Sequence, residues 1–343
     1  MGTRTSSRGA NTGIMDSSAV YLSIVVPMYN EETVIGIFFE RIIPILEDIT
    51  PDYEIICVDD GSDDETFPLL RKAHDKNPKI KIVNLSRNFG KELALTAGID
   101  HAAGQAVVPL DADLQDPPEL IGELVEKWRE GYDMVLAKRV DRSSDSATKR
   151  FTARLFYRLV GRISEVPIPE DVGDFRLMDR RVVDALAMMP ERTRFMKGMF
   201  AWLGFKQATV PYTRAPRAAG TTKWHFMPLW NFALQGIVSF TDFPLKIWSY
   251  IGILCALGSL GYGAFIVLRT LIVGVDVPGY ASLIAVILFF NGLIMMSLGI
   301  MGEYMARLFI EVKRRPLYLV RDAVGFGDTL GTNPRVGRRA DKD

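Results

Sequence analysis

Short apolar runs alternate with amphipathic stretches along the first half of the chain. Five runs rich in β-branched residues predict strands, and the segments between them have helical periodicity. The predicted strands are Tyr21–Val26, Tyr53–Val58, Ile80–Leu85, Ala106–Leu110 and Met134–Ala137. The predicted helices are Glu31–Leu46, Asp63–His74, Lys91–Ala103 and Pro117–Glu130. This order predicts an α/β fold in which helices cover both faces of a mostly parallel sheet.

The second half contains two long stretches without an acidic or basic residue, Ile247–Leu268 and Val277–Gly302. A membrane-spanning helix needs roughly 20 mainly apolar residues. The pattern predicts a hairpin of two transmembrane helices, at about 247–268 and 280–302. A pair of buried core helices is the alternative interpretation.

Cationic residues near the two stretches predict their orientation. Lys246 precedes the first, and Arg307 and Lys313–Arg315 follow the second. Positive residues favour the cytoplasmic side, so both chain ends are expected there. The mostly apolar segment Met227–Phe243 is expected to lie along the membrane surface, with a core helix as the alternative. Residues 1–20 are polar and predict a disordered arm rather than a signal peptide.

Composition narrows the function. The 343 residues contain 41 Lys plus Arg and 41 Asp plus Glu, so no global charge attracts nucleic acid. The mean hydropathy of +0.11 fits a charged domain joined to a membrane part. Two cysteines exclude a disulfide scaffold, and Cys57 is expected to be a small buried hydrophobe. The sequence has neither a P-loop nor a Gly-rich turn after the first strand, which disfavours an ATPase or a dehydrogenase.

Polar motifs follow each predicted strand, at the edge where ligands of open α/β sheets bind. The motifs are Pro27–Glu31, Asp59–Ser62, Ser86–Asn88, Asp111–Asp116 and Lys138–Arg139. In an extended segment Asp111 and Asp113 would point to the same side. Two such carboxylates suit Mg²⁺ or Mn²⁺ shared with a substrate phosphate, and Gln115 could add an oxygen. A solvated acidic turn is the alternative.

The segments VPMYNEE, VDDGSDDET, DADLQDPPE and GDFRLMDRR, in this order, resemble family 2 glycosyltransferases, which have the GT-A fold. DADLQDPP and the two apolar stretches resemble the polyprenyl-phosphate glycosyltransferases. LAKR, TKRF, PERTRFMKG, TKW and GEYMAR are similar to the bactoprenol (undecaprenyl-phosphate) glucosyltransferase type, which is related to dolichol-phosphate mannose synthase. The resemblance covers about residues 21 to 322.

The resemblance implies a role for each matching residue. Nucleotide-sugar binding would fall to Pro27, Tyr29, Glu31, Asp60, Asp111 and Ala112. The metal ligands would be Asp111, Asp113 and Gln115. The catalytic group would be Asp174, Arg139 and Arg150. The acceptor phosphate would contact Arg139, Lys149, Arg150, Arg176 and Lys223.

Together with the hydropathy and charge patterns, the resemblance predicts five parts: an arm (1–20), a cytoplasmic GT-A domain (21–225), an interfacial segment (226–245), two membrane helices (246–306) and a basic cytoplasmic tail (307–343). The expected reaction is inverting transfer of one sugar, glucose from UDP-glucose, to undecaprenyl phosphate at the inner membrane of a bacterium. It needs Mg²⁺ or Mn²⁺, and the subgroup implies a homotetramer.

Alternatives stay open for the sugar, for the class of protein and for the role of Asp174. The sugar could be mannose, N-acetylglucosamine or amino-arabinose, or the chain could be a non-catalytic subunit of a lipid flippase. The lipid phosphate is already largely ionised at neutral pH, so the reaction does not require a general base. Asp174 is therefore expected to orient the sugar or Arg176. A structural ion pair with Arg176 is the alternative, and Asp171 is a weaker candidate.

Overall fold

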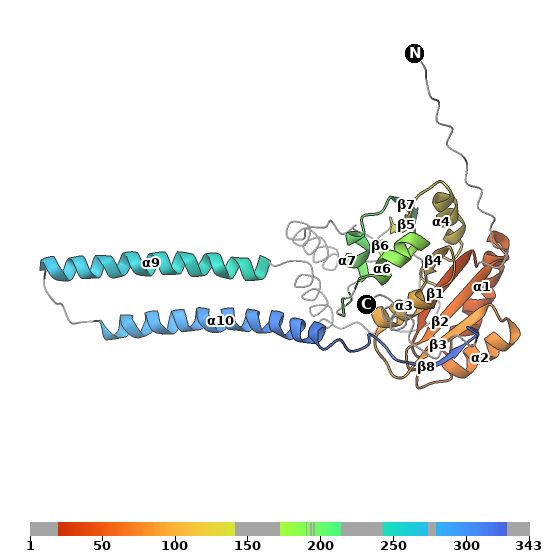
Figure 1. Ribbon diagram of the computed structural model, residues 1–343, viewed down its shortest axis with the longest axis horizontal. Helices are drawn as coiled ribbons and strands as arrows, with labels where there is room; N and C mark the ends of the chain where they lie inside the picture. The colour runs from red at the N-terminus through yellow and green to blue at the C-terminus, as the bar shows by residue number, and fades with distance from the viewer. Residues whose placement is uncertain are drawn as a thin grey trace, which may run out of the picture.

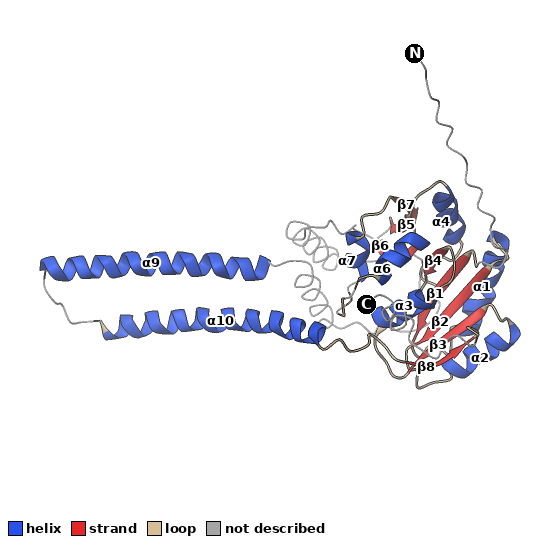
Figure 2. Cartoon of the chain, in the orientation of Figure 1, coloured by secondary structure: helices blue, strands red, loops and turns tan. Residues whose placement is uncertain are grey.

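The computed structural model describes residues 20–140, 172–213 apart from 190, 193 and 195, 243–273 and 279–327. Its α/β domain contains one sheet with helices on both sides (Figures 1 and 2). The strands are β1 (Leu22–Met28), β2 (Tyr53–Asp59), β3 (Ile80–Leu85), β4 (Ala106–Pro109), β5 (Met134–Arg139), β6 (Val172–Asp179), β7 (Gln207–Tyr212) and β8 (Val320–Val324). The helices of this domain are α1 (Ile35–Ile49), α2 (Thr66–Lys76), α3 (Lys91–His101), α4 (Leu120–Arg129), α6 (Arg180–Ala187) and α7 (Met196–Trp202).

The strand order in the sheet is β7-β5-β6-β4-β1-β2-β3-β8. The pairings β1–β2, β1–β4, β2–β3 and β5–β7 are parallel. β6 runs antiparallel to both β4 and β5, and β8 runs antiparallel to β3. The five predicted strands and four predicted helices are all present, within a few residues of their predicted ends. β6, α6, α7, β7 and β8 were not predicted.

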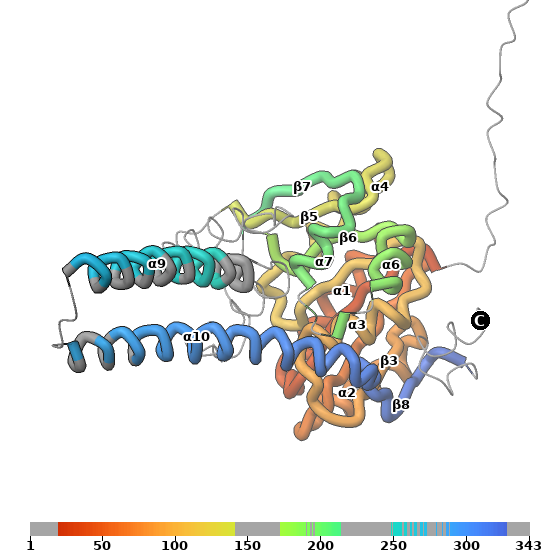
Figure 3. Tube along the Cα trace, turned by 60° about the vertical axis from the view of Figure 1, so that its left-hand side comes forward, coloured from red at the N-terminus to blue at the C-terminus, as the bar shows by residue number. Residues whose placement is uncertain are grey.

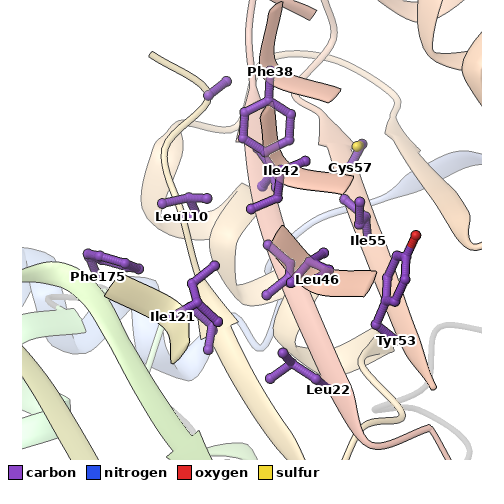
Figure 4. Packing of buried hydrophobic residues seen from close by; sticks show 14 of the residues in the cluster. Leu22, Phe38, Ile42, Leu46, Tyr53, Ile55, Cys57, Leu110, Ile121 and Phe175 are labelled. Atoms are coloured by element: carbon purple, nitrogen blue, oxygen red, sulfur yellow. The ribbon is translucent and has the colours of Figure 1, made fainter. Parts of the chain in front are cut away.

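Alternation along the strands gives the sheet two apolar faces, as period-2 side-chain geometry requires. On one face, Phe38, Ile42 and Leu46 of α1 pack against Ile55 and Cys57 of β2 (Figure 4). α2 and α4 contribute to the same cluster. The opposite face is covered by α3, α6 and α7. Cys57 is fully buried, as predicted, and burial raises the pKa of its thiol.

Two long helices extend from this domain, α9 (Phe243–Val273) and α10 (Tyr280–Val312). They lie side by side in both views of the chain (Figures 1 and 3). Within the described residues, the segment Phe289–Val312 is long and apolar enough to cross a membrane. The predicted stretch 280–302 lies in α10. The stretch 247–268 lies in α9, and its membrane crossing stays a prediction, as does the hairpin.

The chain returns to the domain after α10. Tyr318 is buried beside α3, where its hydroxyl donates to Asp100 Oδ2 at 2.9 Å. The next residues form β8 at the outer edge of the sheet, against β3. The range predicted as a cytoplasmic tail (307–343) thus includes a strand of the sheet. Of the predicted arm only residue 20 is described, and of the predicted interfacial segment only residues 243–245, which begin α9.

Candidate active site

The strand directions bring the predicted motifs to one edge of the sheet. β1, β2, β3 and β4 are parallel neighbours, so the segments after them leave at the same edge. β5 points the same way, which brings its last residue, Arg139, to that edge. Because β6 is antiparallel, it contributes its beginning instead, and Asp174 lies there between β4 and β5. This placement of the GDFR motif depends on a reversal that sequence order does not reveal.

Lys91, the first residue of α3, joins two of the predicted site residues. Its Nζ lies 2.7 Å from both carboxylate oxygens of Asp111 and 3.2 Å from Oδ2 of Asp174. Burial lowers the pKa of this ammonium, but Asp111 and Asp174 outweigh burial and raise it overall. Lys91 therefore stays protonated and offsets the repulsion between the two carboxylates. Sequence analysis assigned Lys91 only to a helix.

Asp174 occupies a largely buried position. Its side chain is 18% exposed, and Oδ1 has no hydrogen-bond partner among the residues that the structure describes. Burial alone would raise the pKa of this carboxyl, but the charges of Lys91, Lys197 and Arg176 lower it overall. Asp174 is therefore ionised at neutral pH and accepts protons poorly. The alternative interpretation paired it with Arg176, whereas its partner within 4 Å among the described residues is Lys91.

Two further charged residues surround Asp174. Glu92, which sequence analysis did not single out, has one buried oxygen that finds no hydrogen-bond partner in the described part of the chain. Burial and the charge of Asp174 raise the pKa of Glu92 to about 7. Arg176 is 4% exposed, donates to the Gly173 carbonyl at 2.6 Å and lies 4.0 Å from the centre of the Phe200 ring. Burial lowers the pKa of Arg176 to about 10, although Asp174 and Glu92 oppose this. Arg176 is thus buried, and a contact with the acceptor phosphate would require its side chain to become exposed.

The loop after β4 presents its polar residues on one side. Asp111, Asp113 and Gln115 are partly exposed, whereas Ala112 and Leu114 between them are buried. β4 ends at Pro109 and the chain turns at residues 112–113, so this segment is not an extended strand. The predicted alternation of exposed polar and buried apolar side chains is nevertheless present. Leu114 has a left-handed backbone (φ 54°), an arrangement that is costly for a bulky residue and typical of functional sites.

The donor set of this loop suits a hard divalent cation. Carboxylate and amide oxygens are the ligands of Mg²⁺ and Mn²⁺, which keep further positions for phosphate oxygens. The Gln115 N–H donates to Asp113 Oδ1 at 3.1 Å and holds that carboxylate in place. Within the described ranges, His, Cys, Asp and Glu side chains form no group of three that could hold a metal by themselves.

A cavity of about 500 Å³ lies further along the same edge, beside the ends of β1, β2 and β3. This volume is typical of small-molecule sites. Of the residues predicted to bind the donor, Tyr29 lines this cavity, whereas Pro27, Glu31 and Asp60 do not. Asp60 is 3% exposed and accepts from the N–H groups of Phe89 and Gly90 at 2.7 and 2.9 Å.

Asp60 and Gly61 fix the loop that forms one wall of the cavity. Gly61 has φ +69°, and a Cβ atom there would approach Asn88 N to 2.7 Å, so only glycine fits. The loops after β1 and β2 are also joined, because Asp63 N donates to Asn30 Oδ1 at 3.0 Å. Asn30 itself has a left-handed backbone (φ 54°).

Four of the predicted site residues fall in parts of the chain that the structure does not describe. Lys149, Arg150, Asp171 and Lys223 lie outside the described residues. The roles proposed for them stay predictions.

Comparison with known proteins identifies the family. Residues 23–187 match the model of glycosyl transferase family 2. An uncharacterized glycosyltransferase of Synechocystis sp. is 57% identical over 90% of this chain and 96% of its own length. The chain belongs to glycosyltransferase family 2.

Two further relatives define the subgroup more closely. A prophage bactoprenol glucosyl transferase homolog of Escherichia coli is 49% identical over 88% of this chain and 98% of its own length. The bactoprenol glucosyl transferase of Shigella phage SfII is 47% identical over 88% and 97%. The predicted resemblance is therefore confirmed at the level of the family and of similarity to this subgroup.

Proposed function

We propose that this glycosyltransferase transfers one glucose unit from UDP-glucose to undecaprenyl phosphate, or to a similar polyprenyl phosphate, with inversion at the anomeric carbon. The observation that carries the proposal is the Lys91 ammonium, which joins Asp111 to Asp174 at the sheet edge that also carries a cavity large enough for a nucleoside. The names of two near full-length relatives support the sugar and the lipid.

Asp111, Asp113 and Gln115 would hold Mg²⁺ or Mn²⁺ together with the donor diphosphate. Asp111 already contacts a positive group, the Lys91 ammonium, which supports a position for a cation beside this carboxylate. When bound, the metal would neutralise the negative charge that develops on the departing UDP. The base and ribose would lie in the cavity that Tyr29 lines.

Asp174 would orient the sugar or the acceptor through its charge rather than remove a proton. Its lowered pKa and the ionised state of the lipid phosphate both favour this role. Arg139 ends β5 on the other side of β6 and would contact the acceptor phosphate there. Lys149, Arg150 and Lys223 are proposed to complete this contact. The positive charge of the buried Arg176 would help to keep Asp174 ionised.

Helices α9 and α10 would anchor the enzyme in the bacterial inner membrane, with both chain ends in the cytoplasm. Large apolar side chains along both helices are exposed, for example Leu254 at 71% and Phe289 at 63%. Such surfaces are typical of membrane contact. The anchor would hold the sheet edge near the head group of the lipid acceptor. A homotetramer is proposed as the assembly.

The test is to incubate the full chain in lipid nanodiscs with UDP-glucose, Mn²⁺ and undecaprenyl phosphate. We expect equal amounts of free UDP and of a glucosyl lipid, identified by mass spectrometry. Undecaprenol, which lacks the phosphate, is the matched acceptor and should give no product. UDP-N-acetylglucosamine and GDP-mannose are the competing donors. Loss of all transfer with every donor would favour the non-catalytic flippase subunit.

A further inference from the structure

The cavity beside β1, β2 and β3 has a wall that comes from the far end of the chain. Among its lining residues are Arg321 and Asp322 of β8, which follow the long helix α10. Sequence analysis placed this segment in a tail and gave it no role. We infer that Arg321, held in place by β8, is a binding residue for the nucleoside part of the sugar donor. This inference rests on the proposed function.

The pairing of β8 with β3 is irregular at Arg321. Asn84 pairs with Asp322 and Leu85 with Val320, so Arg321 has no partner residue in β3. An extra residue of this kind is a β-bulge, which changes the direction of a side chain and is common next to active sites. The bulge lies at the cavity, where Asn84, Leu85 and Asp322 are also lining residues.

One hydrogen bond holds the backbone on each side of the bulge. Asn84 Nδ2 donates to Asp322 Oδ2 at 3.0 Å, and Ser86 N donates to the carbonyl of Leu319 at 2.9 Å. The hydrogen bond of Tyr318 to Asp100 fastens the preceding residues to α3. The backbone that carries Arg321 is therefore held by three strand or helix contacts, although its side chain is 71% exposed.

The charges of the cavity lining favour the nucleoside over the diphosphate. Four carboxylates line it, those of Asp59, Asp63, Asp64 and Asp322. They would repel phosphate groups but can accept hydrogen bonds from the N–H and O–H groups of a base and a ribose. The diphosphate would instead lie toward Lys91 and the loop after β4.

Arg321 is the better placed of the two cations in this lining. The guanidinium of Arg87, the other cation, lies 4.0 Å from the Phe89 ring centre and donates to the Asn88 carbonyl. The ion pair of Arg321 with Asp322 is long, at 3.9 Å, and leaves its planar group able to bind a ligand. A guanidinium stacks on the flat face of a base and donates to its carbonyl oxygens. Both interactions suit a pyrimidine such as uracil.

The experiment measures binding of UDP, UMP and pyrophosphate to the full chain in detergent by calorimetry, with Mn²⁺ present. We expect Arg321→Ala to raise the Kd for UDP and for UMP about tenfold and to leave pyrophosphate binding unchanged. Arg321→Lys should also bind UDP and UMP more weakly, because it keeps the charge but loses the planar group. Arg315→Ala is the matched control, since this exposed residue precedes β8 and does not line the cavity.

The outcomes separate the two proposals. Equal UDP binding by wild type, Arg321→Ala and Arg321→Lys would overturn the role of Arg321 and leave the proposed function intact. Weaker pyrophosphate binding by both variants would also overturn it, because the contact would then be to phosphate. A wild type that binds no UDP would overturn the proposed donor, and the inference with it. If Arg321→Ala unfolds at a lower temperature than wild type, the Kd values of Arg321→Lys and Arg315→Ala for UDP are compared instead, and equal values would overturn the role of Arg321.

Discussion

Replacement of Asp174 by Asn tests whether this residue orients the reactants or removes a proton. The variant keeps the size of the side chain but deletes the charge that lies 3.2 Å from Lys91 Nζ. A lost charge-assisted hydrogen bond costs roughly 1.5–3 kcal/mol, which corresponds to a rate loss of about ten- to over a hundredfold. Because the pKa of Asp174 is lowered, it is ionised throughout the neutral and alkaline range. The loss should therefore be the same at every pH above about 7.5.

The assay is the single-turnover rate of sugar transfer at saturating donor and metal, measured for wild type and variant between about pH 7.5 and 9. This window lies above the pKa of Glu92, which is about 7, so that ionisation of Glu92 contributes little. Asp184→Asn is the control, because Asp184 is an exposed carboxylate of α6 whose partner is Arg180 at 3.9 Å. A deficit of Asp174→Asn that shrinks steadily as pH rises would refute the orienting role and identify Asp174 as a general base.

Three further predictions concern the metal, a buried acid and a glycine. Asp111→Asn or Asp113→Asn should abolish turnover with an unchanged unfolding temperature, and excess EDTA should stop wild-type turnover; full activity in EDTA would refute the metal assignment. The pKa of Glu92 is raised from 4.5 to about 7, so the free energy of unfolding should fall by up to roughly 3 kcal/mol as pH rises between these values. Glu92→Gln should remove this loss and be more stable than wild type at pH 8 but not at pH 4.5, as thermal melts would measure. Gly61→Ala should cost about 1–2 kcal/mol or more from its backbone angle, and it should weaken UDP binding because it displaces the loop beside the cavity. Normal stability and UDP binding in this variant would contradict the close packing described for Gly61.

The sequence patterns predicted the parts of the fold whose signals are local. Strands β1 to β5 are apolar runs bounded by polar turns, and each was found near its predicted position. β6 was missed because Asp174, Arg176 and Asp179 interrupt its apolar pattern. β8 was missed because it is short and charged, and because Asp322 contacts Asn84 across 238 residues. Long-range pairing of this kind leaves no periodic signal.

The sequence also predicted only those site residues that have a local signal. Motifs directly after strands identified Asp111, Asp113 and Tyr29, whose neighbours in sequence mark them. Lys91 and Glu92 begin a helix and resemble ordinary surface charges in the sequence. Lys91 matters because it contacts Asp111 and Asp174, and Glu92 because the charge of Asp174 raises its pKa. Both effects depend on the antiparallel direction of β6, which brings Asp174 to this edge.

The position of β8 has a consequence for how the protein is made. A ribosome synthesises β3 long before β8, and the whole of α9 and α10 must emerge in between. Until then β3 is an open edge strand, which is prone to pair with other chains. The catalytic sheet can therefore be completed only after both long helices have left the ribosome. Synthesis of the two helices and completion of the cavity wall by Arg321 and Asp322 are therefore linked, and a chain that ends before Val320 should aggregate more readily than the full chain.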